Sequence, residues 1–459
     1  MYTIHFENPI HIHFIGIGGI SMSGLAEILL KEGFQVSGSD MTESALTKKL
    51  ISMGAKIDYP QKADNIKEGI DLVVYTAAIH EDNPEYAAAV ATGLPMMPRA
   101  ELLGQIMHNY ANSIGVSGTH GKTTTTSMLT HILIAAGADP TISVGGMLKS
   151  INGNIRVGSS DTFLAEACEY TNSFLHLFPR YTIILNIEED HLDFFADLND
   201  IRHSFRAFAA QTSEQGCVII NGEIEDYQEI VADSKAEVIT FGLNPESLFH
   251  PGEISFDEKA CCSFDVYKSE ELLGHIHLGV PGTHNVANAL SAIALVDDLK
   301  IPFETCAKAL SDFHGTDRRF EYKGMFKGVT VVDDYAHHPS EIEATLKAAK
   351  KYPHERLIVA FQSHTYTRTK SLLPDFGRTL AAADEVVLAP IFAARETDTL
   401  GVSAESIKEE IEKYGTKATT FPDFDAIEKY LFENCHAGDL LITMGAGNLY
   451  TVGEKLVSH

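Results

Sequence analysis

Residues 112–133 constrain the fold of this chain more than any other stretch of its sequence. Apolar Ile114 and Val116 are typical of a strand, and a glycine-rich turn, Gly118-Thr119-His120-Gly121, follows them directly. After the turn, apolar residues recur at helical spacing, namely Met128, Leu129, Ile132 and Leu133. The stretch therefore predicts a strand, a tight turn and a helix, the context in which a Gly-Lys-Thr sequence binds phosphate.

The chemistry of such a loop indicates a nucleotide site. Backbone N–H groups of the turn and the positive N-terminus of the helix bind polyphosphate. We expect Lys122 to reach the terminal phosphates and the Thr123 hydroxyl to hold magnesium. Val116 stands where the usual first glycine falls, and the alternative is an ordinary glycine turn that caps a helix. The flanking strand and helix favour a nucleotide site made of Gly118, Thr119, His120, Gly121, Lys122, Thr123 and Thr124.

Length and charge limit the remaining possibilities. A chain of 459 residues is expected to form about three domains. A net charge of −28 argues against nucleic acid or an anionic membrane as a partner. The six cysteines form no C-x-x-C pair, and buried thiols are the favoured interpretation of the adjacent Cys261 and Cys262. Because no apolar stretch reaches membrane-spanning length and the N-terminus does not resemble a signal peptide, we expect a cytoplasmic protein without membrane insertion.

The first ~100 residues read as a Rossmann-like unit from their strand–helix spacing. A strand from His11 runs into Gly16, Gly18 and Gly19, and a helix follows. This resembles a dinucleotide fingerprint, but Ser21 occupies the position of the third glycine. Asp40 ends the next strand, where a ribose-binding acid is expected. A nicotinamide dinucleotide and a UDP group both remain compatible with this turn.

The second unit contains the phosphate loop and two apolar strands, 162–167 and 182–187. Each strand ends in acid-rich sequence, and ligands of parallel sheets bind beyond the carboxyl ends of the strands. Glu166 and His191 are therefore candidate metal ligands, with solvated loop residues as an equal alternative. Short alternating runs between residues 216 and 281 predict a small antiparallel subregion.

A third strand–helix unit begins near Arg318. Its strands at 328–334 and 357–361 lead into loops that contain Tyr335 and Arg368. Asp333, Asp334, His337 and His338 offer metal-ligand chemistry, although a ligand-binding loop is the favoured interpretation. The expected fold is α/β with three domains: a Rossmann-like domain (1–110), a P-loop ATPase domain with a mostly parallel sheet and the antiparallel subregion (111–317), and a C-terminal Rossmann-like domain (318–459).

Several of these stretches together resemble the Mur ligase family, and the resemblance runs nearly end to end. They are residues 13–19, the loop 118–125, Asn186 to Asp193, His284-Asn285 with Asn288, Arg318-Arg319-Phe320, residues 333–339, Thr367-Arg368-Thr369 and Gly445-Ala-Gly447-Asn448. Other ligases share the phosphate loop, whereas its combination with Arg368 and the Asp-Asp-Tyr-x-His-His loop is much more specific.

The resemblance implies an ATP-dependent amide ligase of peptidoglycan precursor synthesis. ATP, the co-substrate, phosphorylates the lactyl carboxylate of UDP-N-acetylmuramate, and L-alanine then attacks the acyl phosphate. Two Mg²⁺ ions are implied, together with a UDP-sugar domain, a central ATPase and an amino-acid domain. The sequence leaves open a monomer or a homodimer, the domain orientation, feedback regulation, and selectivity among alanine, serine and glycine.

The resemblance also implies roles for individual residues. Lys122, Glu166 and His191 are the catalytic candidates, and Thr123, Glu166 and His191 are the metal ligands. Beyond the loop, the ATP contacts implied are Asn285, Asn288, Arg319 and Asp334. The UDP-sugar contacts implied are Gly16, Gly18, Gly19, Ile20, Ser21, Ser39, Asp40, Thr76 and Arg99. Tyr335, His337 and Arg368 are implied to bind the amino acid.

Three features depart from the family pattern. Cys168 replaces an acid of the common Glu-Ala-Asp-Glu motif, and Thr365 stands where many relatives carry an arginine. Several Mur ligases carry a carbamylated lysine on the helix expected at 199–211, which here offers only Arg202 and Arg206.

Three alternatives remain open from sequence. A ligase that recycles murein tripeptide shares much of the pattern. A nicotinamide-dependent oxidoreductase leaves the phosphate loop unexplained. A nucleotide-gated binding module differs in a testable way, because its phosphate release does not require both a UDP-sugar and an amino acid.

Overall fold

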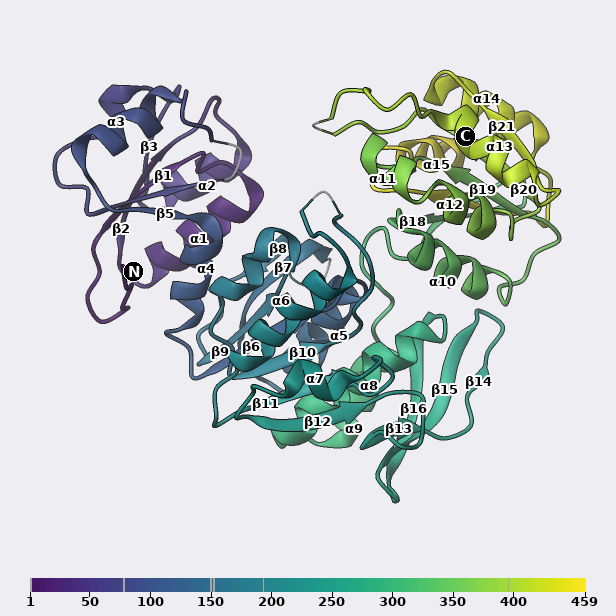
Figure 1. The fold of residues 1–459 in the computed structure, drawn as a ribbon, viewed down its shortest axis with the longest axis horizontal. Helices are drawn as coiled ribbons and strands as arrows, with labels where there is room; N and C mark the ends of the chain where they lie inside the picture. Colours follow the sequence, from purple (N-terminus) through teal and green to yellow (C-terminus); the bar gives the residue numbers. More distant parts are fainter. Residues whose placement is uncertain (1, 77–78, 149–150, 152, 193, 395) are drawn as a thin grey trace.

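The computed structural model describes residues 2–76, 79–148, 151, 153–192, 194–394 and 396–459. Asp193, the last residue of one motif given above, lies outside them. The described residues form three sheets, each covered by helices, which make up the three bodies visible in Figure 1. The three-domain α/β fold expected from the sequence is confirmed.

The first sheet is parallel, in the order β3-β2-β1-β4-β5. Its strands are β1 (His11–Ile15), β2 (Gln35–Ser39), β3 (Lys56–Asp58), β4 (Leu72–Tyr75) and β5 (Met96–Pro98). Its helices are α1 (Ile20–Lys31), α2 (Ala45–Ser52), the 3-10 turn η1 (Ala63–Asn65), α3 (Pro84–Thr92) and α4 (Arg99–Met107). Gly16 has φ +85°, so the turn between β1 and α1 requires glycine there.

The central sheet is parallel from β7 through β9, β6, β10 and β11 to β12 and β13. Antiparallel β8 borders one end and the predicted antiparallel subregion, β13–β16, the other. The strands are β6 (Asn112–Ser117), β7 (Thr141–Leu148), β8 (Gly153–Arg156), β9 (Thr162–Glu166), β10 (Tyr181–Ile184), β11 (Cys217–Asn221), β12 (Glu237–Phe241), β13 (Phe249–Pro251), β14 (Ser255–Phe256), β15 (Cys261–Lys268) and β16 (Glu271–Pro281). The helices are α5 (Lys122–Ala135), 3-10 helix η3 (Tyr170–His176), α6 (Leu198–Ala210), α7 (Tyr227–Val231), α8 (His284–Asp298) and α9 (Phe303–Ser311).

The third sheet has the order β17-β18-β22-β19-β20-β21, with β17 antiparallel to β18 and the other pairs parallel. Its strands are β17 (Glu321–Phe326), β18 (Val329–Asp334), β19 (Leu357–Phe361), β20 (Glu385–Leu388), β21 (Lys417–Thr420) and β22 (Leu440–Met444). Its helices are α10 (Pro339–Ala349), α11 (Tyr366–Ser371), α12 (Leu373–Leu380), α13 (Ala404–Glu412), α14 (Phe424–Asn434) and α15 (Tyr450–Ser458).

The apolar core is shared unequally among the three bodies. One cluster runs without a break from Leu25 and Leu103 of the first body to Phe174 and Phe205 of the second. The C-terminal body has separate clusters on the two faces of its own sheet. Within the described part of the chain, none of the helices has the length and apolar character that crossing a membrane requires.

Candidate active site

The phosphate loop connects β6 to α5 at the carboxyl edge of the central sheet. Gly118 and Gly121 have φ values of +140° and +85°, which glycine adopts readily. A Cβ at Gly121 would also lie 2.7 Å from Asn288 Oδ1. The loop therefore needs glycine both for its conformation and for its close approach to α8.

Lys122 is held by a glutamate that follows β9. Its Nζ donates to Glu169 Oε2 at 2.9 Å and Oε1 at 3.1 Å, and Glu169 is only 2% exposed. Burial alone would lower the pKa of Lys122, but the charge of Glu169 outweighs it and raises that pKa. Lys122 is thus a charged group already paired within the loop.

Two of the proposed metal ligands lie side by side. Thr123 Oγ1 donates to Glu166 Oε1 and Oε2 at 3.1 and 3.0 Å, and the Gly145 N–H donates to Oε2 at 2.7 Å. His191 lies apart from this pair, with its Nε2 3.9 Å from Glu169 Oε1 and its ring 4.5 Å from that of Tyr170. The structure therefore separates the three residues into two positions, the Thr123–Glu166 pair and His191 beside Glu169.

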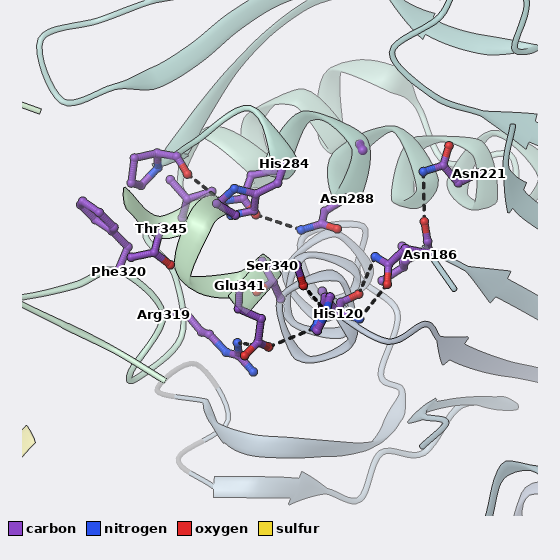
Figure 2. A pocket seen from close by; sticks show the side chains of 18 of the residues that line it. His120, Asn186, Asn221, His284, Asn288, Arg319, Phe320, Ser340, Glu341 and Thr345 are labelled. Atoms are coloured by element: carbon purple, nitrogen blue, oxygen red, sulfur yellow. Dashed lines mark hydrogen bonds and ion pairs between the residues drawn. The ribbon is translucent and has the colours of Figure 1, made fainter. Parts of the chain in front are cut away.

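A cavity of about 320 Å³ opens between the loop and the C-terminal body (Figure 2). Seven of the residues expected to contact ATP line it: His120, Gly121, Thr124, Asn285, Asn288, Arg319 and Asp334. Asn288 Nδ2 donates to Asn285 Oδ1 at 3.0 Å, and Asn285 Nδ2 donates to Pro281 O at 2.7 Å. Gly118, Thr119, Lys122 and Thr123 do not line this cavity, although Thr123 lines an adjoining one with Glu166, Arg319 and Tyr335.

His120 joins the loop to helix α10, as Figure 2 shows. Its Nε2 lies 2.7 Å from Ser340 Oγ and 3.5 Å from Glu188 Oε2, and its Nδ1 lies 3.3 Å from Glu341 Oε1. Burial would lower the pKa of His120, but the hydrogen bonds that its ring donates to Glu188 and Glu341 outweigh burial and raise the pKa to about 9. The cation at this junction is therefore neutralised from both bodies.

Glu341 also lies beside Arg319 and His337, and burial lowers the pKa of His337 to about 4, so its ring is neutral near pH 7. Arg319 Nη1 lies 3.6 Å from Glu341 Oε1, and His337 Nδ1 lies 3.3 Å from Glu341 Oε2. Nearby, Asp334 accepts from the N–H groups of Phe320 and Ala336 at 2.8 and 2.7 Å. Burial raises the pKa of Asp334 to about 6, partly offset by Arg319.

A second cavity, of about 710 Å³, contains Arg368. Arg368 Nη2 donates to Asp190 Oδ1 at 2.9 Å, which links the C-terminal body to the central one, and Nη1 lies 3.1 Å from His364 Nδ1. Burial would raise the pKa of Asp190, but the Arg368 charge lowers it. The His337 ring lies 5.8 Å from that of His364 and 5.3 Å from that of Tyr335, so the expected loops do meet.

The first body carries a cavity of about 690 Å³ at its glycine turn. Gly16, Gly18, Gly19, Asp40 and Thr76 line it, as do Met41, Gln61, Ile79, His80, Asp82 and Asn83, which the sequence did not single out. Asp40 Oδ2 accepts from the Gly18 N–H at 2.8 Å. Ile20, Ser21 and Ser39 flank this turn without lining the cavity.

Arg99 differs from the other expected sugar contacts. It begins α4 and does not line the glycine-turn cavity. Burial lowers its pKa. Its position reflects the packing of α4 between the two bodies, which a motif in the sequence does not encode.

Comparison with known proteins places this geometry in a family. Profiles described as "Mur ligase family, catalytic domain", "Mur ligase middle domain" and "Mur ligase, glutamate ligase domain" match residues 11–111, 116–296 and 318–447. The chain is 61% identical over 457 residues to the UDP-N-acetylmuramate–L-alanine ligase of Agathobacter rectalis, covering 100% of both chains. The chain belongs to the Mur ligase family. A protein from Lachnospira eligens with the same name as the Agathobacter ligase is 58% identical, again over 100% of both chains.

Solved structures agree with this assignment to the Mur ligases. A UDP-N-acetylmuramate-alanine ligase from Thermotoga maritima matches with a TM-score of 0.79 and 30% identity over 98% of each chain. A murein peptide ligase from Psychrobacter arcticus matches with a TM-score of 0.69 and 25% identity, also over 98% of each chain.

Sequence reasoning missed several charged residues of this Mur ligase site. Glu169, Glu188 and Asp190 belong to acid-rich strand ends that were noted, but only Glu166 and His191 were selected from them. The sequence does contain a signal for Glu341, because it stands three residues after the helix-capping position His338 and completes a capping box. Its contacts to His120 and Arg319 depend on the packing of two bodies and carry no sequence signature.

Proposed function

We propose that this Mur ligase joins L-alanine to UDP-N-acetylmuramate with consumption of ATP. The γ-phosphoryl group passes to an oxygen of the lactyl carboxylate, and ADP leaves. The amine nitrogen of alanine then attacks the carbonyl carbon of the acyl phosphate. Inorganic phosphate departs with the oxygen, the nitrogen loses its proton, and an amide bond remains.

One observation carries the choice of substrates: the 61% identity, over the whole of both chains, to a ligase named for these substrates. The geometry supports the same reaction, because the phosphate loop, the carboxylates and the Arg368 cavity all lie at the junction of two bodies. Phosphoryl transfer depends on positioning and charge neutralisation more than on a protein nucleophile.

In this proposal Lys122 leaves Glu169 to hold the γ-phosphate. The donor set of Thr123 and Glu166, a hydroxyl beside a carboxylate, fits the hard-oxygen preference of Mg²⁺, and His191 beside Glu169 supplies a second position. Mg²⁺, when bound, neutralises charge on the phosphate oxygens. Asn285 and Asn288 hold the adenine side, while Arg319 and Asp334 contact ATP across the junction.

The remaining substrates occupy the other two bodies. The glycine turn of the first body binds the UDP group through backbone N–H groups, and Arg99 faces the sugar end, near the central body. Arg368 binds the carboxylate of alanine, with Tyr335 and His337 beside it. We place the domain boundaries at residues 110/111 and 317/318, which separate the three sheets.

Phosphate release tests the proposal when it is measured across a panel of UDP-muramyl acceptors and amino acids. We expect release only when ATP, UDP-N-acetylmuramate and alanine are all present, in a 1:1 ratio with amide product. Release with murein tripeptide in place of alanine would instead support the recycling ligase, the activity suggested by the more distant structural match. Release without any acceptor would contradict both.

A further inference from the structure

His120, Glu188 and His338 form a cluster of potential metal ligands, of which only His120 belongs to the expected nucleotide site. One potential ligand atom from each residue lies within 4.8 Å of the others. His120 belongs to the phosphate loop, Glu188 follows β10, and His338 caps α10. The cluster therefore spans the junction between the central and the C-terminal bodies.

His338 provides a second, independent observation. The residue is only 7% exposed, and its Nε2 is among the buried polar atoms without a hydrogen-bond partner. Such atoms are normally satisfied by a protein group, a water or an ion, so this nitrogen is available to a ligand. Its Nδ1 lies 2.8 Å from Ser340 Oγ. Nδ1 also accepts from the Ser340 N–H at 3.3 Å in the helix cap. Metal binding at Nε2 therefore takes the other tautomer, in which the proton lies on Nδ1 and is donated to the Ser340 hydroxyl, the arrangement typical of metal-bound histidine.

The ligand chemistry of the cluster selects a class of ion, and one of its distances is compatible with that class. His120 Nε2 lies 3.5 Å from Glu188 Oε2. Two ligands at opposite ends of a tetrahedron edge are separated by about 3.3–3.4 Å when each bond is 2.0–2.1 Å. Imidazole nitrogens suit zinc and its neighbours, whereas magnesium prefers oxygen ligands. The two histidines and one carboxylate therefore favour a transition metal, whereas the Thr123–Glu166 pair favours magnesium.

We propose that His120, Glu188 and His338 form a binding site for a divalent transition metal such as Zn²⁺. On binding, the metal displaces to solvent the proton that His120 carries in the metal-free protein, bonds to groups of both bodies and holds α10 against the phosphate loop. Because His120, Glu188 and Ser340 also line the nucleotide cavity, the fourth coordination position faces that cavity. The site is separate from the magnesium positions of the proposed reaction.

The test uses the full-length, metal-stripped protein without ATP or sugar, titrated with Co²⁺ and with Zn²⁺. Co²⁺ should bind with 1:1 stoichiometry and give the intense visible absorption of a tetrahedral N/O site, and one equivalent of Zn²⁺ should abolish that absorption. Zn²⁺ should also raise the melting temperature, because it binds the folded state. Absence of a tetrahedral spectrum would overturn the proposal.

His338→Asn is the decisive variant. Asparagine is a good helix N-cap, so α10 keeps its cap while the Nε2 ligand is removed. The affinity for Co²⁺ should fall at least ten- to a hundredfold. Glu188→Gln, which keeps the shape of the side chain, should show a similar loss. Unchanged affinity in both variants would refute the site.

His277→Asn is the matched control. His277 is an exposed residue of β16 beside Ser263 and Asp257, the type of surface histidine that binds metal weakly. This variant should retain wild-type affinity, and a loss equal to that of His338→Asn would overturn the proposal. Since no substrate is present, failure of these titrations leaves the proposed ligase activity untouched.

Discussion

At the scale of single residues, the site is a set of charges that are already paired before a substrate arrives. Lys122 is held by Glu169, Arg368 by Asp190, and His120 by Glu188 and Glu341. The sequence identified the three positive residues, because each belongs to a motif with a recognisable glycine, strand or loop context. The sequence did not identify the carboxylates that pair with them, because the composition of an acid-rich loop does not determine which of its carboxylates is buried beside a cation.

Lys122→Ala should lower the ligation rate by about two orders of magnitude or more, since one positive charge in a dry phosphate site contributes several kcal/mol to transition-state stabilisation. Steady-state ligation and UDP-sugar binding are the two measurements. Binding to the first body should persist, because its cavity does not include the loop. Near-normal turnover would rule out the proposed role of Lys122.

Arg368→Ala should raise the Michaelis constant for alanine about ten- to a hundredfold, through loss of a charge-assisted contact of ~1.5–3 kcal/mol. The constants for ATP and UDP-sugar should change little. Because removal of Arg368 leaves Asp190 unpaired, Arg368→Ala/Asp190→Asn is the matched control. Equal losses for all three substrates in the double variant would show that Arg368 is structural.

The His120 cluster predicts a pH dependence of stability in the metal-free protein. The folded pKa of about 9 lies above the ordinary value of 6.5. The ionic contribution is therefore complete below pH 6.5 and is lost as pH rises through about 9. His120→Gln should lower the melting temperature at pH 6, and the difference from wild type should shrink by pH 9.5. A difference that is constant over this range would contradict the assignment.

At the scale of elements, segments with regular apolar spacing were predicted close to their observed bounds, whereas short or irregular segments were not. Strand β19 has the predicted bounds, 357–361, and α5 begins directly after the glycine turn, as predicted. Strand β10 ends at Ile184, three residues before the apolar run 182–187 does, because Leu185 and Asn186 turn toward the phosphate loop. The short hairpin β7–β8 and the edge strand β17 lacked a pattern strong enough to predict.

Helix α6 occupies the place where several Mur ligases carry a carbamylated lysine, and here it offers two arginines instead. Its Arg202 donates to the carbonyl oxygens of Glu225 and Asp226, and its Arg206 pairs with Asp233. Neither arginine can accept CO₂ as a lysine amine does. Ligation should therefore be independent of added bicarbonate, as measured in CO₂-depleted buffer. Rescue by bicarbonate would show that another amine is carbamylated.

At the scale of the whole molecule, the two junctions differ in kind. The first and central bodies share one apolar core, whereas the central and C-terminal bodies meet through His120, Arg368 and their carboxylates. Glycines permit the close contact at the apolar junction. A Cβ at Gly104 would overlap His176 O, and one at Gly24 would lie 2.9 Å from Ile155 Cβ. The sequence motifs predict the three bodies one by one. They do not predict which surfaces of the bodies pack together, because those contacts form only in the folded chain.

Gly24→Ala should destabilise the protein by about 1–3 kcal/mol through overpacking against Ile155. Ile155→Ala in the same chain should recover part of that loss, so a double-mutant cycle of denaturant unfolding measures the contact directly. Additive losses from the two substitutions would show that the bodies do not meet at this point.

The pairing of Lys122 with Glu169 has a consequence for which anions the loop retains. If Lys122 binds phosphate as proposed, an incoming phosphate must displace the Glu169 carboxylate, so it gains only the difference between two ion pairs. Inorganic phosphate brings no other contact to offset that exchange, whereas a nucleotide also fills the cavity beside Asn285 and Asn288. The glutamate is thus an internal competitor that discriminates against small anions, and its return to Lys122 favours departure of the phosphate left after each turnover.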